Sequence, residues 1–277
     1  MVVFVWFLQS RAVDMDKKAL LEWHIDAGAD EAVGEEAVNH FTSGERRVTS
    51  DEKKESSSLT THHSPLVTQS PLHHSPSAAT AVSRKLADEA KTLAELEAAV
   101  RAFDGCAIKK TASKTVFCDG NPKARVMVIG EAPGAQEDIQ GIPFCGQSGK
   151  LLDAMLASIG LDRTSVYISN TVFWRPPGNR QPSPEETATC LPFVEKHIAL
   201  VQPKLLLLSG GTATTTLLQK DISISRLRGK LYDYTNPYLK PPISTLVTYH
   251  PSYLLRSPGQ KRLAWADMLL IKDFLSK

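Results

Sequence analysis

Three separated parts of this sequence carry side chains that could take part in chemistry. The first holds the carboxylates Glu131, Glu137 and Asp138, the second the carboxamide of Asn170, and the third the imidazole of His250. Carboxylate and imidazole groups commonly transfer protons in enzymes. His250 is one of only two histidines after residue 84, and it ends a predicted strand. We therefore expect it to have a functional role and not to be a core histidine.

Arginines accompany two of these parts. Arg175 and Arg180 follow Asn170, and Arg256 follows His250. Most surface arginines are only solvated, but three of them on loops at one rim indicate an anionic partner. The turn at 130–134 lacks the Gly-Lys-[Ser/Thr] of a Walker phosphate loop and the G-x-G-x-x-G dinucleotide pattern, so the sequence does not predict either nucleotide site.

Alternating strands and helices must position these groups. Apolar runs predict four buried strands at 125–129, 166–169, 204–208 and 245–249, and periodic segments predict helices starting at 92 and covering 151–159, 185–200, 213–218 and 261–275. This alternation predicts an α/β fold with three layers, α/β/α, around a central, mainly parallel, four-stranded sheet. Sites in such sheets lie at the carboxyl ends of the strands, so we expect the three parts to meet in one cleft.

The composition divides the chain. Of 277 residues, 42% are hydrophobic, and no apolar run reaches the ~18 residues that a membrane helix needs. Residues 1–84 carry a net charge of −4 and residues 85–277 one of +6. We expect an N-terminal extension at 1–41 with a short helix at 16–27, a disordered Ser-, Pro- and His-rich linker at 42–84, and one folded domain at 85–277.

Three ordered strings, GEAPGAQEDIQGIPFCG, SNTVFWRPPGNRQP and YHPSYLLR, resemble those of family 4 uracil-DNA glycosylases. The resemblance covers about residues 103–277 and extends to the spacing of the strings. It implies a uracil-DNA glycosylase-like fold and a monomeric base excision repair enzyme. Such an enzyme flips uracil out of DNA and hydrolyses its N-glycosidic bond, which leaves an abasic site.

The resemblance also implies how the base is bound. Phe144 would stack on the flipped base, and the carboxamide of Asn170 would pair with the N3–H and O4 edge of uracil. Gly130 and Ala132 would line the same pocket. On residue type alone, Phe144 suits the core equally well and Asn170 suits a turn equally well.

The implied catalytic groups come from two of the three strings. His250 would donate a hydrogen bond to uracil O2 while the base leaves as an anion. Glu131 would stabilise the sugar cation and orient water, with Asp138 and Glu137 as alternatives that the sequence does not rank. The residues expected to contact DNA are Gly134, Arg175, Arg180, Ser252, Tyr253, Leu254, Leu255 and Arg256, of which residues 253–255 would form an apolar wedge.

Family 4 enzymes typically carry a four-iron, four-sulfur cluster on four cysteines, and this chain departs from that pattern. Cys106 and Cys190 match two ligand positions, but Phe103 and Trp174 occupy the other two. Neither aromatic side chain can ligate iron. We therefore expect no metal and no cofactor, with apolar packing at these two positions. Reduced cysteines fit a cytoplasmic location.

Two other functional classes remain open. The chain could be a non-catalytic DNA-binding accessory of replication or repair, although such a protein would not need Glu131, Asn170 and His250 together. It could also be a small-molecule nucleosidase, which the arginines fit poorly. The expected partners are uracil-containing DNA and, through the N-terminal extension, a replication or repair protein.

Overall fold

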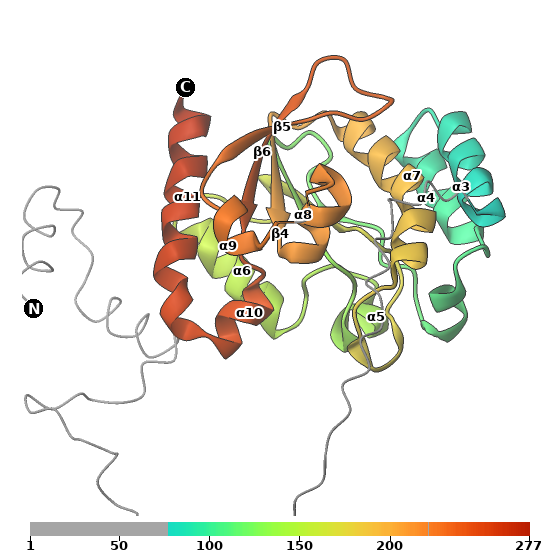
Figure 1. Ribbon diagram of the computed structural model, residues 1–277, viewed down its shortest axis with the longest axis horizontal. Helices are drawn as coiled ribbons and strands as arrows, with labels where there is room; N and C mark the ends of the chain where they lie inside the picture. The colour runs from blue at the N-terminus through green and yellow to red at the C-terminus, as the bar shows by residue number, and fades with distance from the viewer. Residues whose placement is uncertain (1–76, 221) are drawn as a thin grey trace, which may run out of the picture. The chain divides into compact units, whose positions relative to one another are not determined.

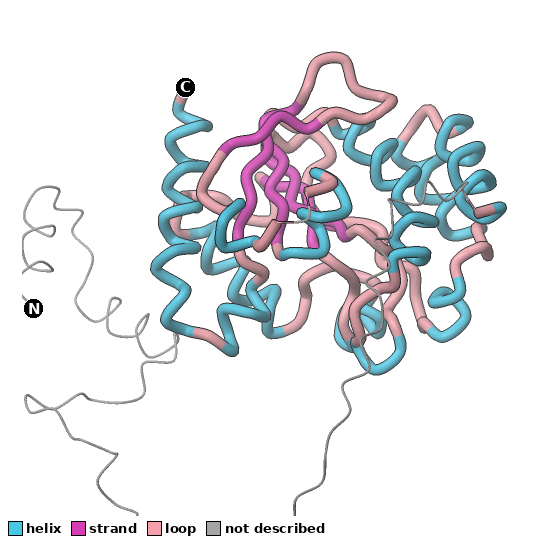
Figure 2. The backbone as a smooth tube through the Cα atoms, in the orientation of Figure 1, coloured by secondary structure: helices cyan, strands magenta, loops and turns pink. Residues whose placement is uncertain are grey.

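Four strands, almost wholly buried, run parallel through the centre of the structure. They are β2 (Val126–Gly130), β3 (Val166–Asn170), β4 (Leu205–Ser209) and β6 (Ile243–Thr248). The computed structural model describes residues 77–220 and 222–277. Val, Ile, Leu and Met make up most of β2 and β4, and nearly every residue of the four strands is buried, which fits a parallel sheet covered on both faces. Figure 2 shows the strands in magenta between the helices.

Two antiparallel edge strands complete the sheet. They are β1 (Asp119–Gly120), which pairs with β3, and β5 (Leu231–Tyr234), which pairs with β6. The strand order is β1-β3-β2-β4-β6-β5. The α/β class and the parallel centre are as predicted, but the predicted number of four strands is wrong, since the sheet has six.

Alternate residues of each strand face two different layers of helices. Met127 and Ile129 of β2 pack with one layer, and Val126 and Val128 with the other. Figure 1 shows the sheet between these layers. The first layer contains α3 (Ala78–Glu89), α4 (Leu93–Ala102), α7 (Pro184–Val201) and α8 (Gly211–Leu218), and the second contains α6 (Gln147–Ala157) and α11 (Lys261–Ser276).

Side-chain caps begin several of these helices. Oγ1 of Thr92 accepts from the backbone N–H of Glu95 at the start of α4, as the sequence predicts. Ser183 and Glu186 form a reciprocal capping box at the start of α7. Ser77 caps α3, which begins inside the range 42–84 that the sequence predicts to be a linker. Within the described residues, regular structure therefore starts at Ala78, before residue 85, where the sequence predicts the folded domain to begin.

Other boundaries also differ from the expectation. The helix expected at 151–159 begins four residues earlier, at Gln147. The predicted extension and the rest of the predicted linker, residues 1–76, lie outside the described residues. Three short helices and three 3₁₀ turns occupy segments expected to be loops: α5 (Ala135–Gln140), α9 (Ile224–Leu227), α10 (Pro251–Arg256), Ala107–Thr111, Pro177–Asn179 and Pro258–Gln260.

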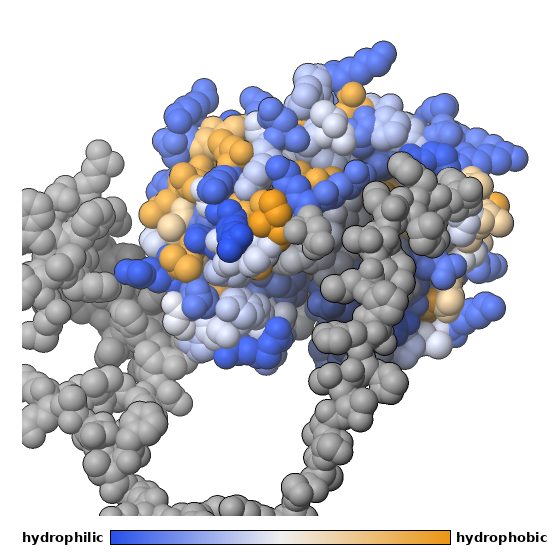
Figure 3. Space-filling model, in the orientation of Figure 1, coloured by the Kyte–Doolittle hydropathy of each residue, from blue (hydrophilic) through white to orange (hydrophobic). Residues whose placement is uncertain are grey.

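Helix α11 presents apolar side chains on both of its faces. Met268 and Ile271 are buried against the sheet, whereas Trp265, Leu269 and Leu270 are each more than 40% exposed. Hydrophobic atoms therefore appear along the left side of Figure 3, where α11 lies. Within the described residues, no helix combines the length and the apolar character needed to cross a bilayer.

Candidate active site at the carboxyl ends of the strands

A cavity of about 720 Å³ lies where the parallel strands end. Segments that follow β2, β3, β4 and β6 all contribute to its walls, as the fold class predicts. The predicted site residues that line it are Glu131, Ala132, Gly134, Glu137, Phe144, Asn170, Arg180, His250, Ser252, Tyr253 and Arg256. The three parts of the sequence that carry reactive groups therefore meet in one place.

Gly130 leaves room for two of these side chains. A Cβ atom at Gly130 would lie 2.5 Å from Oδ1 of Asn170 and 2.5 Å from Cζ of Phe144. Asn170 is the last residue of β3 and lies opposite Gly130 in the sheet. Its side chain is 2% exposed, and its Oδ1 has no hydrogen-bond partner among the described residues. Because an unpaired buried acceptor costs about 1–3 kcal/mol, this oxygen suits a ligand that brings a donor.

His250 is held in a defined tautomer. It caps the N-terminus of α10, where its Nδ1 accepts from the backbone N–H of Ser252 at 3.1 Å and lies 2.7 Å from the Ser252 hydroxyl. Since Nδ1 is an acceptor, the proton of the neutral ring lies on Nε2. Burial, with a smaller contribution from Arg256, lowers the pKa of His250 to about 4. At neutral pH the ring is therefore an uncharged Nε2–H donor.

Two neighbours fix the position of this imidazole. Its centroid lies 5.4 Å from that of the Phe144 ring, so the two rings share one end of the cavity. A Cβ atom at Gly210, after β4, would approach Cβ of His250 to 3.0 Å. Gly210 also has a φ of +101°, which glycine adopts most easily. The loop after β4 thus helps to position His250, although it carries no ionisable group of its own.

Glu131 is the carboxylate best placed for chemistry. It lines the cavity, and one of its oxygens, Oε2, accepts from Oγ1 of Thr212 at 2.6 Å. Its backbone carbonyl accepts from Oγ1 of Thr171, also at 2.6 Å. Both contacts orient Glu131 and leave its second carboxylate oxygen available. Sequence reasoning missed Thr212, and only its place after a strand end could have indicated it.

The other two carboxylates bind backbone amides. Glu137 lines the cavity, but its two oxygens accept from the N–H groups of Gly134 at 3.1 Å and Gly146 at 2.9 Å. Asp138 is 4% exposed and does not line the cavity. Its Oδ1 accepts from the N–H groups of Ser113 and Lys114, at 2.8 and 3.1 Å. The assignment of Asp138 to the catalytic groups is therefore corrected: it anchors a loop.

The residues expected to contact DNA divide into several groups. Arg180 forms a bidentate ion pair with Glu186, at 2.6 and 2.8 Å. Arg175 does not line the cavity, and its Nε donates to Oδ1 of Asn179 at 2.7 Å. The charge of Arg180 is therefore paired with a carboxylate, whereas Arg175 is oriented by a neutral carboxamide and keeps its charge.

The predicted apolar wedge is partly wrong. Leu254 is fully buried and packs with Tyr249 and Ala264, so its side chain is not presented at the surface where DNA would bind. Leu255, the next residue of α10, is 44% exposed. Tyr253 lines the cavity, as do Ser252 and Arg256.

Comparison with known proteins identifies the family to which the chain belongs. The sequence pattern of the Uracil DNA glycosylase superfamily matches residues 117–270, more than half of the chain. The chain belongs to this superfamily. A type-4 uracil-DNA glycosylase of Saccharolobus solfataricus is 37% identical over 182 residues, which cover 64% of this chain and 83% of the relative. The type-4 uracil-DNA glycosylase of Thermotoga maritima is 35% identical over 181 residues, or 64% of this chain and 92% of the relative.

Aromatic packing fills the two positions, 103 and 174, that the sequence resemblance assigns to ligands of an iron-sulfur cluster. The buried ring of Phe103 packs edge-on against Phe193, with centroids 5.3 Å apart. The buried indole of Trp174 donates from Nε1 to Oγ1 of Thr115 at 3.0 Å. Cys106 and Cys190 are buried, free thiols.

These side chains offer two sulfur donors where a four-iron cluster needs four. Across residues 77–220 and 222–277, no group of three or more His, Cys, Asp and Glu side chains is arranged to hold a metal ion. The residues present therefore do not fit that cluster.

Proposed function

We propose that this chain is a monofunctional uracil-DNA glycosylase of base excision repair. It extrudes uracil from DNA, hydrolyses the N-glycosidic bond and leaves an abasic site. The type-4 uracil-DNA glycosylases among its relatives support this activity. The observation that carries the proposal is the buried, unpaired Oδ1 of Asn170, which lies beside the Phe144 ring in the cavity.

Asn170 accounts for the choice of base. Uracil presents an N3–H donor next to its O4 acceptor, and one carboxamide can accept from the first through Oδ1 and donate to the second through Nδ2. Cytosine presents an acceptor at N3 and a donor at N4. It would leave both groups of Asn170 unpaired in a buried site, at a cost of about 1–3 kcal/mol for each. The ring of Phe144 would stack on the base held in this way.

His250 and Glu131 would share the bond cleavage. As the C1′–N1 bond breaks, its electron pair leaves with the base, and negative charge builds up on uracil O2. The neutral Nε2–H of His250 can donate to that oxygen, and such a donor typically contributes several kcal/mol. The free oxygen of Glu131 can stabilise the positive sugar and orient a water molecule. The hydroxyl of that water bonds to C1′, and its proton passes through Glu131 to solvent, so no covalent enzyme intermediate is needed.

The DNA partner is proposed to meet the rim formed by Tyr253, Leu255 and Arg256. We further propose that the protein acts in the cytoplasm as a monomer without an iron-sulfur cluster. Iron analysis of the purified protein is expected to give less than one iron per chain. A brown protein with about four irons per chain would contradict this part of the proposal.

The activity is tested with matched oligonucleotides that carry U, T, C or hypoxanthine at one position, followed by alkaline cleavage of abasic sites. We expect cleavage at U, and a loss on the order of 100- to 1,000-fold in Asn170→Ala and in His250→Ala. Unchanged cleavage by either variant would remove its assigned role. Binding to all four oligonucleotides without any cleavage would instead favour the DNA-binding accessory.

A further inference from the structure

Phe144 has an unusual backbone conformation for its residue type. Its φ is +52°, in the left-handed region that bulky residues rarely adopt. Its carbonyl also lies against Gly149 of α6, where a Cβ atom would come within 1.6 Å of the carbonyl oxygen. A conformation of this kind persists only where the surrounding structure holds it. The ring that lines the cavity therefore depends on whatever fixes residues 143–146.

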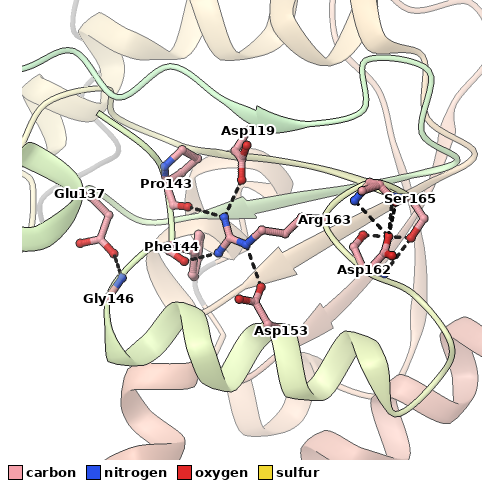
Figure 4. Close-up of polar contacts among 10 residues, drawn as sticks. Asp119, Glu137, Pro143, Phe144, Gly146, Asp153, Asp162, Arg163 and Ser165 are labelled. Carbon is pink, nitrogen blue, oxygen red and sulfur yellow. Dashed lines mark hydrogen bonds and ion pairs between the residues drawn. The ribbon is translucent and has the colours of Figure 1, made fainter. Parts of the chain in front are cut away.

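Arg163 makes the contacts that fix this turn. It lies between α6 and β3, and its guanidinium donates from Nη1 to the carbonyl of Pro143 at 3.1 Å and from Nη2 to the carbonyl of Phe144. Figure 4 shows both bonds from the one guanidinium. Two consecutive carbonyls are thus held by a rigid, planar group, which restricts rotation of the backbone between them.

Two carboxylates hold Arg163 in turn. Its Nη1 lies 2.6 Å from Oδ2 of Asp119 in β1, and its Nε lies 2.9 Å from Oδ1 of Asp153 in α6 (Figure 4). The guanidinium therefore links the edge strand, a helix and the turn before that helix. Arg163 does not line the cavity, so it has no direct access to a bound base.

The other side of the turn is held by Glu137. Its Oε1 accepts from the N–H of Gly146 at 2.9 Å, while Arg163 binds the carbonyls at 143 and 144 (Figure 4). Glu137 thus binds a backbone N–H of the turn, and Arg163 binds two of its backbone carbonyls. Arg163 supplies the bonds nearest to Phe144 itself.

We propose that Arg163 is a positioning residue that sets the Phe144 ring in the cavity by binding the carbonyls of Pro143 and Phe144. This role rests on the proposed function in one respect, that the ring stacks on the flipped base. A lysine at 163 retains the charge beside Asp119 and Asp153 but cannot bind both carbonyls and both carboxylates with a planar fork.

A double-mutant cycle tests whether Arg163 acts through Phe144. Single-turnover cleavage of a uracil oligonucleotide is measured for the wild type, Arg163→Ala, Phe144→Ala and the double variant. Arg163→Ala alone should lose on the order of 100-fold, the cost of a misplaced active-site group. In the Phe144→Ala background the same substitution should change the rate by less than about 2-fold, which is the scatter of such cycles, because the two substitutions then remove the same contribution. Losses that multiply in the double variant would overturn the proposal.

Arg84→Ala is the matched control, and Arg163→Lys guards against a folding defect. Arg84 is also partly exposed, 36% against 26% for Arg163, and forms an ion pair with Glu195 at 2.5 Å. Its loss should leave the cleavage rate unchanged. Arg163→Lys should be slower than the wild type, and millimolar guanidinium should restore part of the rate of Arg163→Ala. A lysine variant as fast as the wild type, or no rescue by guanidinium, would count against the role.

Amide hydrogen exchange of the free proteins separates this proposal from the proposed function. Exchange at residues 144–149 should be faster in Arg163→Ala than in the wild type, and unchanged in Arg84→Ala. This measurement needs no substrate. If the wild type cleaves no uracil, the proposed function fails while the exchange result still decides whether Arg163 holds the turn. Equal exchange at 144–149 in all three proteins would overturn the positioning role.

Discussion

Oγ1 of Thr212 donates a 2.6 Å hydrogen bond to Oε2 of Glu131, although the two residues are 81 positions apart in the chain. Thr212 lies in the first turn of α8, directly after β4, and Glu131 directly follows β2. Strands β2 and β4 are parallel neighbours, so their carboxyl ends bring these side chains together. The bond occupies one oxygen of a carboxylate that lines the cavity.

Thr212→Val should therefore slow the reaction without weakening DNA binding. The valine keeps the shape of the side chain but removes a hydrogen bond to a carboxylate, which is worth about 1.5–3 kcal/mol. We expect the single-turnover rate to fall by roughly 10- to 150-fold and the KM for uracil DNA to stay the same. Thr212→Ser, which keeps the hydroxyl, is the control. If the valine variant retains the full rate, Thr212 does not orient Glu131 for catalysis.

Protonation of His250 should occur only in acid. Burial lowers its pKa from 6.5 to about 4, so the neutral ring persists from pH 8 down to about pH 5. Below that, protonation removes the Nδ1 acceptor that caps α10. NMR titration of the imidazole should show no transition between pH 7 and 5. A midpoint near 6.5 would contradict the assigned neutral state.

The same shift has a consequence for stability. In the unfolded chain His250 takes up a proton as the pH falls through 6.5, but in the folded chain it does so only near pH 4. The unfolded state therefore binds more protons in this window, and stability falls as the pH falls. His197, buried with a pKa of about 3, acts in the same direction. The melting temperature should therefore fall less between pH 7 and pH 5 in His250→Gln than in the wild type. An equal fall in the two proteins would refute this.

Loss of the Asp138 side chain should mainly lower stability, whereas loss of the Glu131 side chain should mainly lower the cleavage rate. Asp138→Ala removes the acceptor of two backbone N–H groups in a buried loop, so we expect about 1–3 kcal/mol less stability. Below its melting temperature, this variant should cleave at close to the wild-type rate. Glu131→Ala should show the reverse pattern, with a large rate loss and little change in melting temperature. A large rate loss in fully folded Asp138→Ala would return Asp138 to the catalytic groups.

The central sheet could be predicted from the sequence because its strands are short, nearly continuous apolar runs between helical segments. The edge strands could not. β1 has only two residues, and β5 (LYDY) has an exposed, mixed composition, so neither carries a strong pattern. Pairing with β3 and β6 makes them strands, and this pairing depends on tertiary contacts.

The site was predictable to the extent that it lies at strand ends. Glu131, Asn170 and His250 each follow or end a strand and line the cavity as expected. The contacts of Thr212 and Arg163 were harder to predict, because they join parts of the chain that only the assembled sheet brings together. The place of Thr212 after a strand end puts it near the site without naming its partner, and the local sequence around Arg163 gives no indication of its contacts.

The pair Leu254 and Leu255 shows a further limit and offers a matched test. The sequence presents them as equivalent members of an apolar wedge, but successive residues of α10 point about 100° apart, so Leu254 is buried and Leu255 is 44% exposed. Leu254→Ala should lower the free energy of unfolding by about 2–5 kcal/mol. Leu255→Ala should leave stability unchanged and should slow uracil removal from duplex DNA more than from single-stranded DNA, since only a duplex leaves a gap for a wedge to fill. Equal slowing on both substrates would show that Leu255 does not support base extrusion.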